Sequence, residues 1–140
     1  MKKFLSLFLL LGFVGLSSNL AFAVNSYDAY GRKTGSYRET SNGYNSYDSY
    51  GRKTGSYKET SNGYNSYDSY GRKTGSYKET SSGYNSYDSY GRNTGSYKTD
   101  SIGRTTSYDK YGRKTGSFKT DSSGRTTRYD KYGRKLGSYR

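Results

Sequence analysis

The 140-residue sequence contains no cysteine, no histidine, no proline and no tryptophan. Without cysteine, an exported chain of this kind has no disulfides to stabilise it, and a thiol nucleophile is excluded. Without histidine, the chain lacks the most common general base. Serine and aspartate are plentiful, but they recur at regular intervals instead of converging on one place. These absences predict a protein that is not an enzyme and that uses no cofactor.

Aliphatic residues are nearly absent after residue 23. Apart from the 20 tyrosines, the apolar side chains of residues 24–140 are Val24, Ala29, Ile102, Phe118 and Leu136. An aliphatic core is therefore excluded, and burial of tyrosine alone falls short of the conformational entropy lost when the chain becomes ordered. Order must come from repetitive backbone pairing with aromatic stacking, from self-association, or from a ligand.

The N-terminus has the pattern of a signal peptide. Lysines at positions 2 and 3 precede a 13-residue apolar run over 4–16, and Ala-Phe-Ala ends at Ala23. This predicts a helical signal peptide over residues 1–23, cleaved between Ala23 and Val24, and a product that is secreted, periplasmic or on the cell surface. A 13-residue helix spans about 20 Å, short of the roughly 30 Å hydrocarbon core, so stable transmembrane anchoring is not expected. An uncleaved anchor is the alternative interpretation.

Positive charge dominates the rest of the chain. The sequence has 24 Lys and Arg against 11 Asp and Glu, and only Lys2 and Lys3 of these lie in the predicted signal peptide. Such an excess predicts an anionic partner, either an anionic polymer or a glycan. The alternative is that the charge only keeps a tyrosine-rich chain soluble.

Residues 24–140 form a tandem repeat rich in Tyr, Gly and Arg. The units are 25–44, 45–64, 65–84, 85–105, 106–126 and a truncated 127–140, with a period of 20 or 21 residues. A period of this length is typical of an array of one supersecondary unit.

Each unit has the pattern of a β-hairpin. In the second unit, a long arm over 52–60 and a short arm over 64–68 flank Asn62-Gly63, the strongest short hairpin signal. Lys53, Gly55, Tyr57 and Glu59 are predicted to share one face of the long arm. The sequence thus predicts an all-β fold of tandem hairpins in an open repetitive sheet or a solenoid. Low hydrophobicity with high net charge also fits a chain that is partly disordered in isolation.

The segments "YDKYGRK" (108–114) and "GRTTRYD" (124–130) resemble the YD repeat, also called the RHS repeat, of bacterial surface and secreted toxin-related proteins. The resemblance extends over almost all of residues 24–140, but most of the aliphatic positions of the family are missing. It implies hairpins that join one long spiralling sheet. Large members enclose a toxin domain, and others support adhesion or carbohydrate contact. Six short units are too few to enclose a domain, so only the hairpin array is expected here.

The motif Tyr-Gly-Arg recurs in all six units and is the candidate binding site. Arginine can hold a phosphate, sulfate or carboxylate with two hydrogen bonds, and a nearby tyrosine can stack on a sugar or a base. The candidate residues are Tyr30, Arg32, Tyr50, Arg52, Tyr70, Arg72, Tyr90, Arg92, Tyr111, Arg113, Tyr132 and Arg134.

Six weak sites would bind a polyanion with avidity. The alternative is that each Tyr packs across strands and each Arg pairs with a nearby Asp, as Arg52 would with Asp48. The Asp after each Tyr is predicted to cap a turn, and no metal site is expected.

These features together predict a secreted, non-enzymatic repeat protein that binds an anionic or glycan surface at several points. Envelope polysaccharide, matrix polysaccharide and other polyanions are the candidate partners, and no small-molecule substrate is expected. The alternatives are a self-assembling extracellular matrix or fibre protein, because the units suit stacking between chains, and a disordered remnant of a longer YD-repeat protein.

Overall fold

A computed structural model describes residues 23–140, which form twelve β-strands and no helix. The strands are β1 (Ala23–Asp28), β2 (Lys33–Thr40), β3 (Gly43–Asp48), β4 (Lys53–Thr60), β5 (Gly63–Asp68), β6 (Lys73–Thr80), β7 (Gly83–Asp88), β8 (Asn93–Thr99), β9 (Thr105–Asp109), β10 (Lys114–Thr120), β11 (Thr126–Asp130) and β12 (Lys135–Tyr139). The predicted all-β fold of repeated hairpins is confirmed. Within the described part of the chain, no helix is long and apolar enough to cross a membrane.

The predicted signal peptide lies almost entirely outside the described residues. Only its last residue, Ala23, is described, and it pairs with Arg38 at the start of β1. Val24, the residue after the predicted cleavage point, pairs with Tyr37. Cleavage at this point would therefore shorten β1 by one residue and leave Val24 in the sheet.

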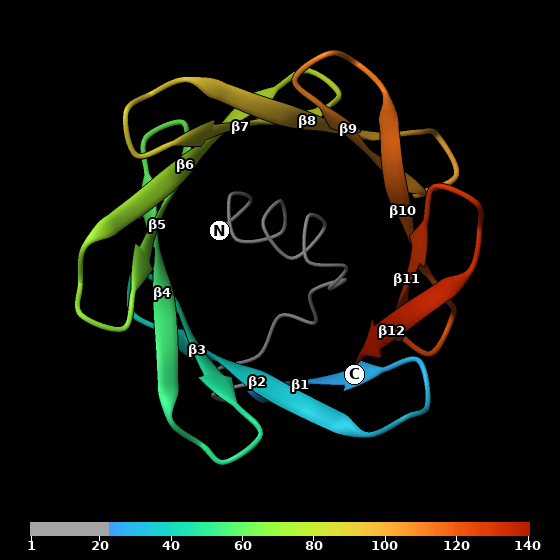
Figure 1. Cartoon of the computed structure of the whole chain (residues 1–140), viewed down its shortest axis with the longest axis horizontal. Helices are drawn as coiled ribbons and strands as arrows, with labels where there is room; N and C mark the ends of the chain where they lie inside the picture. The colour runs from blue at the N-terminus through green and yellow to red at the C-terminus, as the bar shows by residue number, and fades with distance from the viewer. Residues whose placement is uncertain (1–22) are drawn as a thin grey trace.

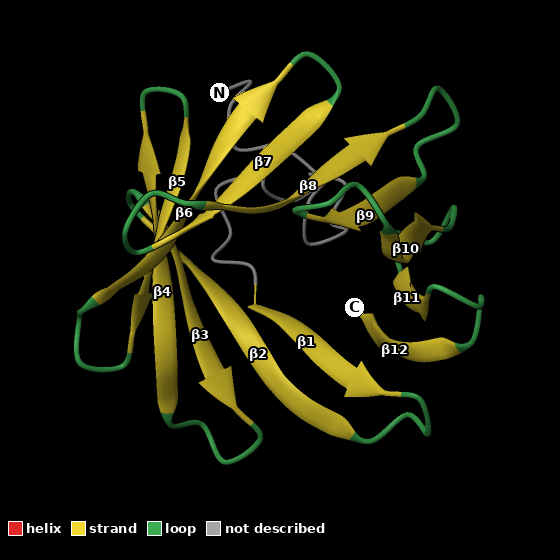
Figure 2. Ribbon diagram, turned by 45° about the horizontal axis from the view of Figure 1, so that its top comes forward, coloured by secondary structure: helices red, strands yellow, loops and turns green. Residues whose placement is uncertain are grey.

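The twelve strands form a closed barrel, so the predicted open sheet or solenoid is wrong (Figures 1 and 2). Each strand pairs antiparallel with its neighbours in sequence, and β12 pairs with β1. No short arm follows the last long arm, β12, and β1, the first short arm of the chain, pairs with β12 in its place. Because β-sheets twist, an array of hairpins curls on itself, and closure pairs the two strand edges that an open array would leave exposed.

The seam between β1 and β12 is short. β1 and β12 form three residue pairs, whereas β2 and β3 form six. The pair of Ser26 with Tyr139 lies at the C-terminal end of β12. Beyond the strand end, Asn25 and Arg140 exchange two backbone hydrogen bonds of 2.8 Å. The barrel is thus closed by fewer contacts than hold its other strands together.

The Asn-Gly turns connect the two arms of their hairpins but are not type I′. Thr60 pairs with Gly63, so the two turn residues are Ser61 and Asn62. No described residue other than glycine has a positive φ, which excludes the type I′ turn that Asn-Gly favours. Glycine is needed here for another reason: a Cβ on Gly63 would collide with the backbone carbonyl of Tyr77.

A β-bulge in each long strand changes the predicted faces. Ser46 pairs with Gly55 and Tyr47 pairs with Lys53, which leaves Thr54 as the extra residue. The Thr54 hydroxyl donates a 3.0 Å hydrogen bond to Ser46 Oγ, so Thr54 lies on the face of Gly55. Lys53 turns to the opposite face. The predicted grouping of Gly55 with Tyr57 and Glu59 holds, and that of Lys53 with them is wrong.

One aromatic residue from the long arm of each unit points into the barrel. Ring centroids lie 6.2–6.4 Å apart in four neighbouring pairs: Tyr37 with Tyr139, Tyr57 with Tyr77, Tyr77 with Tyr97, and Tyr97 with Phe118. The two strands of each pair have one strand between them, so their backbones lie about 9.6 Å apart along the wall. Because the rings are closer together than the backbones that carry them, the rings converge toward the barrel axis. We call these six residues the aromatic collar: Tyr37, Tyr57, Tyr77, Tyr97, Phe118 and Tyr139. The contact of Tyr37 with Tyr139 carries the collar across the seam.

The buried core of the protein lies inside the barrel, in its lumen. Eight strands enclose an interior that side chains just fill, so twelve leave a wider one. Tyr44, Tyr64 and Tyr84 pack against the collar and are 4, 2 and 4% exposed. In later units Thr105 and Thr126 take the equivalent position and are bonded to Thr99 and Thr120 at 2.8 and 2.7 Å. A cavity of about 690 Å³ remains, bordered by β3 to β10.

Candidate functional site

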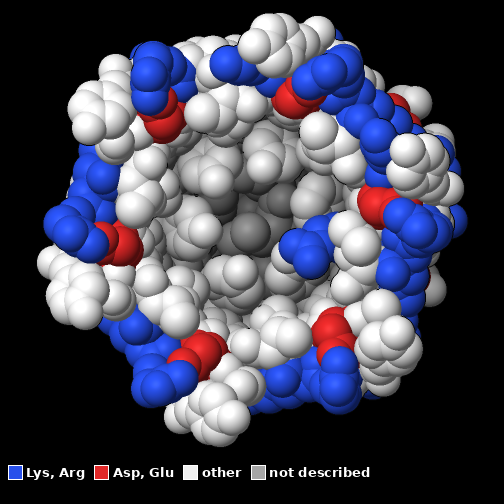
Figure 3. Space-filling view, in the orientation of Figure 1, with Lys and Arg blue, Asp and Glu red and all other residues white. Residues whose placement is uncertain are grey.

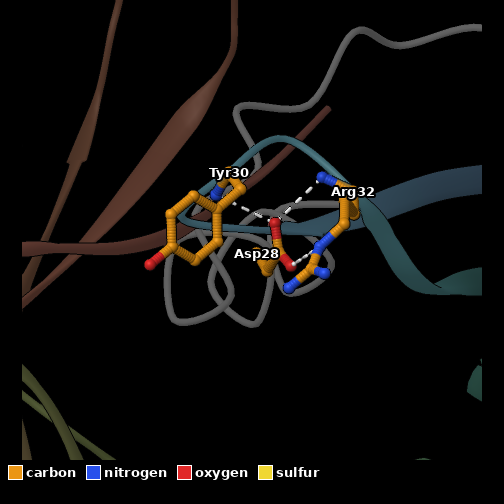
Figure 4. A network of polar contacts seen from close by, with 3 residues as sticks. All are labelled: Asp28, Tyr30 and Arg32. Atoms are coloured by element: carbon orange, nitrogen blue, oxygen red, sulfur yellow. Dashed lines mark hydrogen bonds and ion pairs between the residues drawn. The ribbon is translucent and has the colours of Figure 1, made fainter.

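The Tyr-Gly-Arg motifs lie in the turns at one end of the barrel. In the first, Asp28 Oδ1 accepts hydrogen bonds of 2.9 Å from the backbone N–H groups of Tyr30 and Arg32 (Figure 4). Asp28 Oδ2 accepts a third, of 2.7 Å, from Arg32 Nε. Gly31 has φ 81° and donates its N–H to the Asp28 carbonyl at 3.1 Å. The predicted turn-capping role of aspartate and the alternative prediction of an Asp–Arg pair are both confirmed.

The same arrangement occurs six times around one mouth of the barrel. The Arg Nε to Asp Oδ2 distance is 2.6–2.7 Å in every copy. Figure 3 shows basic and acidic side chains side by side around the central hollow. We call these segments the rim turns: 28–32, 48–52, 68–72, 88–92, 109–113 and 130–134. The repeat thus places six identical charge pairs in a ring.

The aspartates of the rim turns are held in their charged form. The backbone N–H of Arg52 lowers the pKa of Asp48 most, its guanidinium and the N–H of Tyr50 add to this, and partial desolvation opposes them. In Asp130 desolvation is the largest single influence, yet the bonds from Arg134 and Tyr132 together still lower its pKa. A charged carboxylate fixes the arginine beside it, so the guanidinium is preorganised.

Each predicted tyrosine lies beside the predicted arginine of its own unit. The six tyrosines are 70–86% exposed, so the alternative prediction that each of them packs across strands is wrong. The guanidinium carbon lies 5.2–5.4 Å from the ring centroid in every pair. Only Nε is bonded to the aspartate, so the two terminal nitrogens can still hold an anion. The structure brings Tyr and Arg together within each unit but spreads the six pairs around the mouth, without forming one pocket.

Acidic side chains are confined to two places. Eight of the 11 are turn aspartates: six in the rim turns, and Asp100 and Asp121 in equivalent turns at the opposite end. The other three, Glu39, Glu59 and Glu79, face the lumen because they follow the collar tyrosines by two residues and pair with Tyr44, Tyr64 and Tyr84. All the charged side chains on the outer wall of the described barrel are therefore positively charged.

A row of cations lies over tyrosine rings on this outer wall. Arg38 Cζ lies 4.8 Å from the Tyr47 centroid, and lysines in β4, β6 and β8 lie 5.0–5.5 Å from Tyr67, Tyr87 and Tyr108. Lys119 occupies the same position in β10. We call these five residues the wall cations: Arg38, Lys58, Lys78, Lys98 and Lys119. All five are exposed.

The sequence interpretation did not single out the wall cations as a binding site. The signal was present, because each of them directly follows an aromatic residue of its long arm, and residue alternation places it on the opposite face. What the sequence could not show is that one of these faces becomes the outside of a barrel and the other its lumen.

The sequence matches no known protein family, no curated protein and no solved structure. The resemblance to YD repeats therefore stays a prediction. Across residues 23–140, no group of three or more acidic residues is placed to hold a metal ion.

Proposed function

We propose that this is an exported, non-enzymatic protein whose outer surface binds an anionic polymer or glycan, such as an acidic polysaccharide of the cell envelope or the extracellular matrix. The observation that supports this most is the distribution of charge: every acidic side chain lies in a turn or in the lumen, which leaves the outer wall cationic. Export rests on the predicted signal peptide. The resemblance to repeats that support adhesion or carbohydrate contact agrees with the proposal.

The spacing of the wall cations suits an extended polymer. They stand on every second strand, about 10 Å apart around the barrel. Arg38, Lys58, Lys78 and Lys98 each lie over a tyrosine ring, so a bound sugar ring would find an apolar face beside a positive charge. The arginines and tyrosines of the rim turns continue this surface to the mouth. Each contact with a screened, exposed charge is weak, and several on one rigid wall bind by avidity.

The test uses polygalacturonate as the probe and a triple variant, Lys58→Gln with Lys78→Gln and Lys98→Gln. The wild-type protein should bind, and the logarithm of its affinity should fall linearly with the logarithm of the salt concentration. Removing three cations should make that slope shallower by about 2 to 3. Equal binding by the two proteins would refute the proposal.

Net charge needs a separate control, and the lumen supplies one. Glu39→Gln, Glu59→Gln and Glu79→Gln together raise the net charge by the amount that the lysine changes lower it. The variant that combines all six substitutions therefore has the wild-type net charge but lacks three wall cations. This variant should bind as weakly as the triple lysine variant, because the wall and not the total charge forms the site. Recovery of binding would instead attribute the affinity to overall charge.

Self-assembly is a second candidate function, and the short seam favours it. If β1 and β12 separate, β12 of one chain can pair with β1 of the next in the register of the closed barrel. Such head-to-tail contacts produce larger rings or filaments. Sedimentation over a range of concentrations, with fibre diffraction of any pellet, tests this. Assemblies with cross-β spacing would support the second candidate, and a monomer at all concentrations would exclude it.

A further inference from the structure

One lumenal position breaks the symmetry of the repeat. In five units it carries serine, at positions 26, 46, 66, 86 and 107. In the sixth unit the equivalent residue is Arg128. It pairs with the collar residue Phe118 on one side and with Gly137 on the other, as Ser46 pairs with Tyr37 and Gly55. Arg128 therefore points into the lumen, and the glycine opposite leaves room for its long side chain.

The charge of Arg128 acts across the lumen. Burial raises the pKa of Tyr37, the neighbouring Tyr139 adds to this, and the positive charge of Arg128 opposes both. Tyr37 is in β2 and Arg128 is in β11, three strands away along the wall. The guanidinium of Arg128 can act on the Tyr37 hydroxyl over this separation because both side chains point into the lumen. The aromatic collar thus has one cation beside it.

This cation has no acidic partner among the described residues. The ion pairs of residues 23–140 all join an aspartate to the arginine four residues later in a rim turn. The lumenal glutamates lie on β2, β4 and β6, two residues beyond the collar tyrosines. Arg128 is itself exposed. A guanidinium that is accessible, unpaired and beside aromatic rings is suited to hold an anionic group of a ligand.

The cavity has the size and the lining of a ligand site. Its volume of about 690 Å³ lies within the range of small-molecule pockets. Aromatic rings from Tyr57 to Phe118 form one part of its lining. Serine and threonine hydroxyls form another, among them Ser66 and Thr74, which are bonded to each other at 3.0 Å. Hydroxyls that pair with one another keep lone pairs for further hydrogen bonds.

We propose that the lumen binds a short acidic oligosaccharide, with its sugar rings against the aromatic collar, its hydroxyls on the Ser and Thr side chains, and one carboxylate or sulfate on Arg128. A single cation near three glutamates and six aspartates selects for one anionic group per ligand over a dense polyanion, which the carboxylates would repel. This site is inside the barrel and separate from the wall cations, so it stands or fails independently of the proposed outer surface.

The test measures binding to the purified protein by calorimetry. The probes are sialyllactose, which carries one carboxylate, a monosulfated trisaccharide and the neutral maltotriose. At least one acidic probe should bind with one ligand per chain and more tightly than maltotriose, and the tighter of the two identifies the anion. Failure of both acidic probes, or equal binding of maltotriose, would overturn the proposal.

Two variants locate the site. Arg128→Ser installs the residue that five other units carry, so the fold should be kept, which far-ultraviolet circular dichroism checks. It should weaken the binding of the acidic probe at least tenfold, whereas Arg104→Ser, which removes one exposed arginine from a turn at the opposite end of the barrel, should leave the affinity unchanged. Equal binding by wild type and Arg128→Ser would contradict the lumenal site, as would binding of several ligands per chain.

Discussion

The aromatic collar should make the barrel sensitive to alkali. Burial raises the pKa of Tyr77 from 10.0 to about 12, and the charges that Tyr97 and Tyr37 would carry when ionised add to this. Burial likewise raises the pKa of Tyr57. A raised pKa means that the folded state favours the neutral phenol. Its stabilisation is fully present below pH 10, the unfolded value, and is lost as the pH rises through the folded value.

The size of the effect follows from the shift. A change from 10 to about 12 at Tyr77 corresponds to about 3 kcal/mol of unfolding free energy that is lost once the pH exceeds 12. Tyr37, Tyr57 and Tyr97 also have raised pKa values from burial. Because whole domains of this size are stable by only about 5–15 kcal/mol, the barrel should unfold cooperatively within this window of pH.

The assay follows tyrosinate absorbance and far-ultraviolet circular dichroism on the same samples as the pH is raised. Tyr77→Phe removes one titrating hydroxyl and keeps the ring, as Phe118 does naturally in β10. It should move the unfolding midpoint to higher pH. Tyr70→Phe is the control, because Tyr70 is 84% exposed and its hydroxyl is in water in both states; it should not move the midpoint.

Two results would refute this reasoning. One is an identical alkaline midpoint for the wild type and Tyr77→Phe. The other is complete ionisation of all tyrosines while the strand signal is retained, since this would show that the collar hydroxyls are not shielded from water.

Three further predictions concern the turns, the bulge and the seam. Gly55→Ala should cost about 1–3 kcal/mol in chemical unfolding, because its Cβ would lie 2.5 Å from a backbone carbonyl of the next strand. Gly51→Asn should cost less, since asparagine tolerates the left-handed conformation at φ 82° and nothing lies within 4 Å; equal losses would contradict the close approach. The backbone N–H of Arg72 holds the pKa of Asp68 below 3.8, so this turn keeps its stabilisation above pH 3.8 and loses it as the pH falls through the lower folded value; an NMR carboxyl titration with a midpoint at or above 3.8 would contradict this. Asn25→Pro removes a seam hydrogen bond, which should cost about 1 kcal/mol and increase dimer formation in size-exclusion chromatography; an unchanged elution profile would argue against a seam that opens.

Local structure could be predicted from the sequence because it depends on neighbouring residues. The Asp cap, the Gly-Arg turn and the two arms of each hairpin follow from turn chemistry and residue alternation. The long arm predicted over 52–60 is β4 at Lys53–Thr60. The bulge at Thr54 could not be predicted, because it depends on how closely Gly55 approaches a carbonyl of the neighbouring strand.

Closure could not be predicted because it depends on the sum of small twists over all twelve strands. Each hairpin is compatible with an open sheet, and the pairing of β1 with β12 is what distinguishes the barrel from it. The lumenal site was hidden for the same reason. Aligning "GRTTRYD" with "GYNSYD" places Arg128 at a serine position, but its meaning depends on knowing which face becomes the interior.

The joining of β12 to β1 has a consequence for how such a protein can change size. The hairpin that spans the seam is divided between the two ends of the chain, while the complete units between them are nearly interchangeable in sequence. Recombination between two such units would add or remove one whole hairpin and leave both halves of the divided hairpin intact. Because barrel diameter grows roughly in proportion to strand number, each event would change the bore by about one-sixth. Proteins related in this way would have lumens of graded width, so the number of repeat units would set the size of the ligand that fits, without a single substitution in the wall.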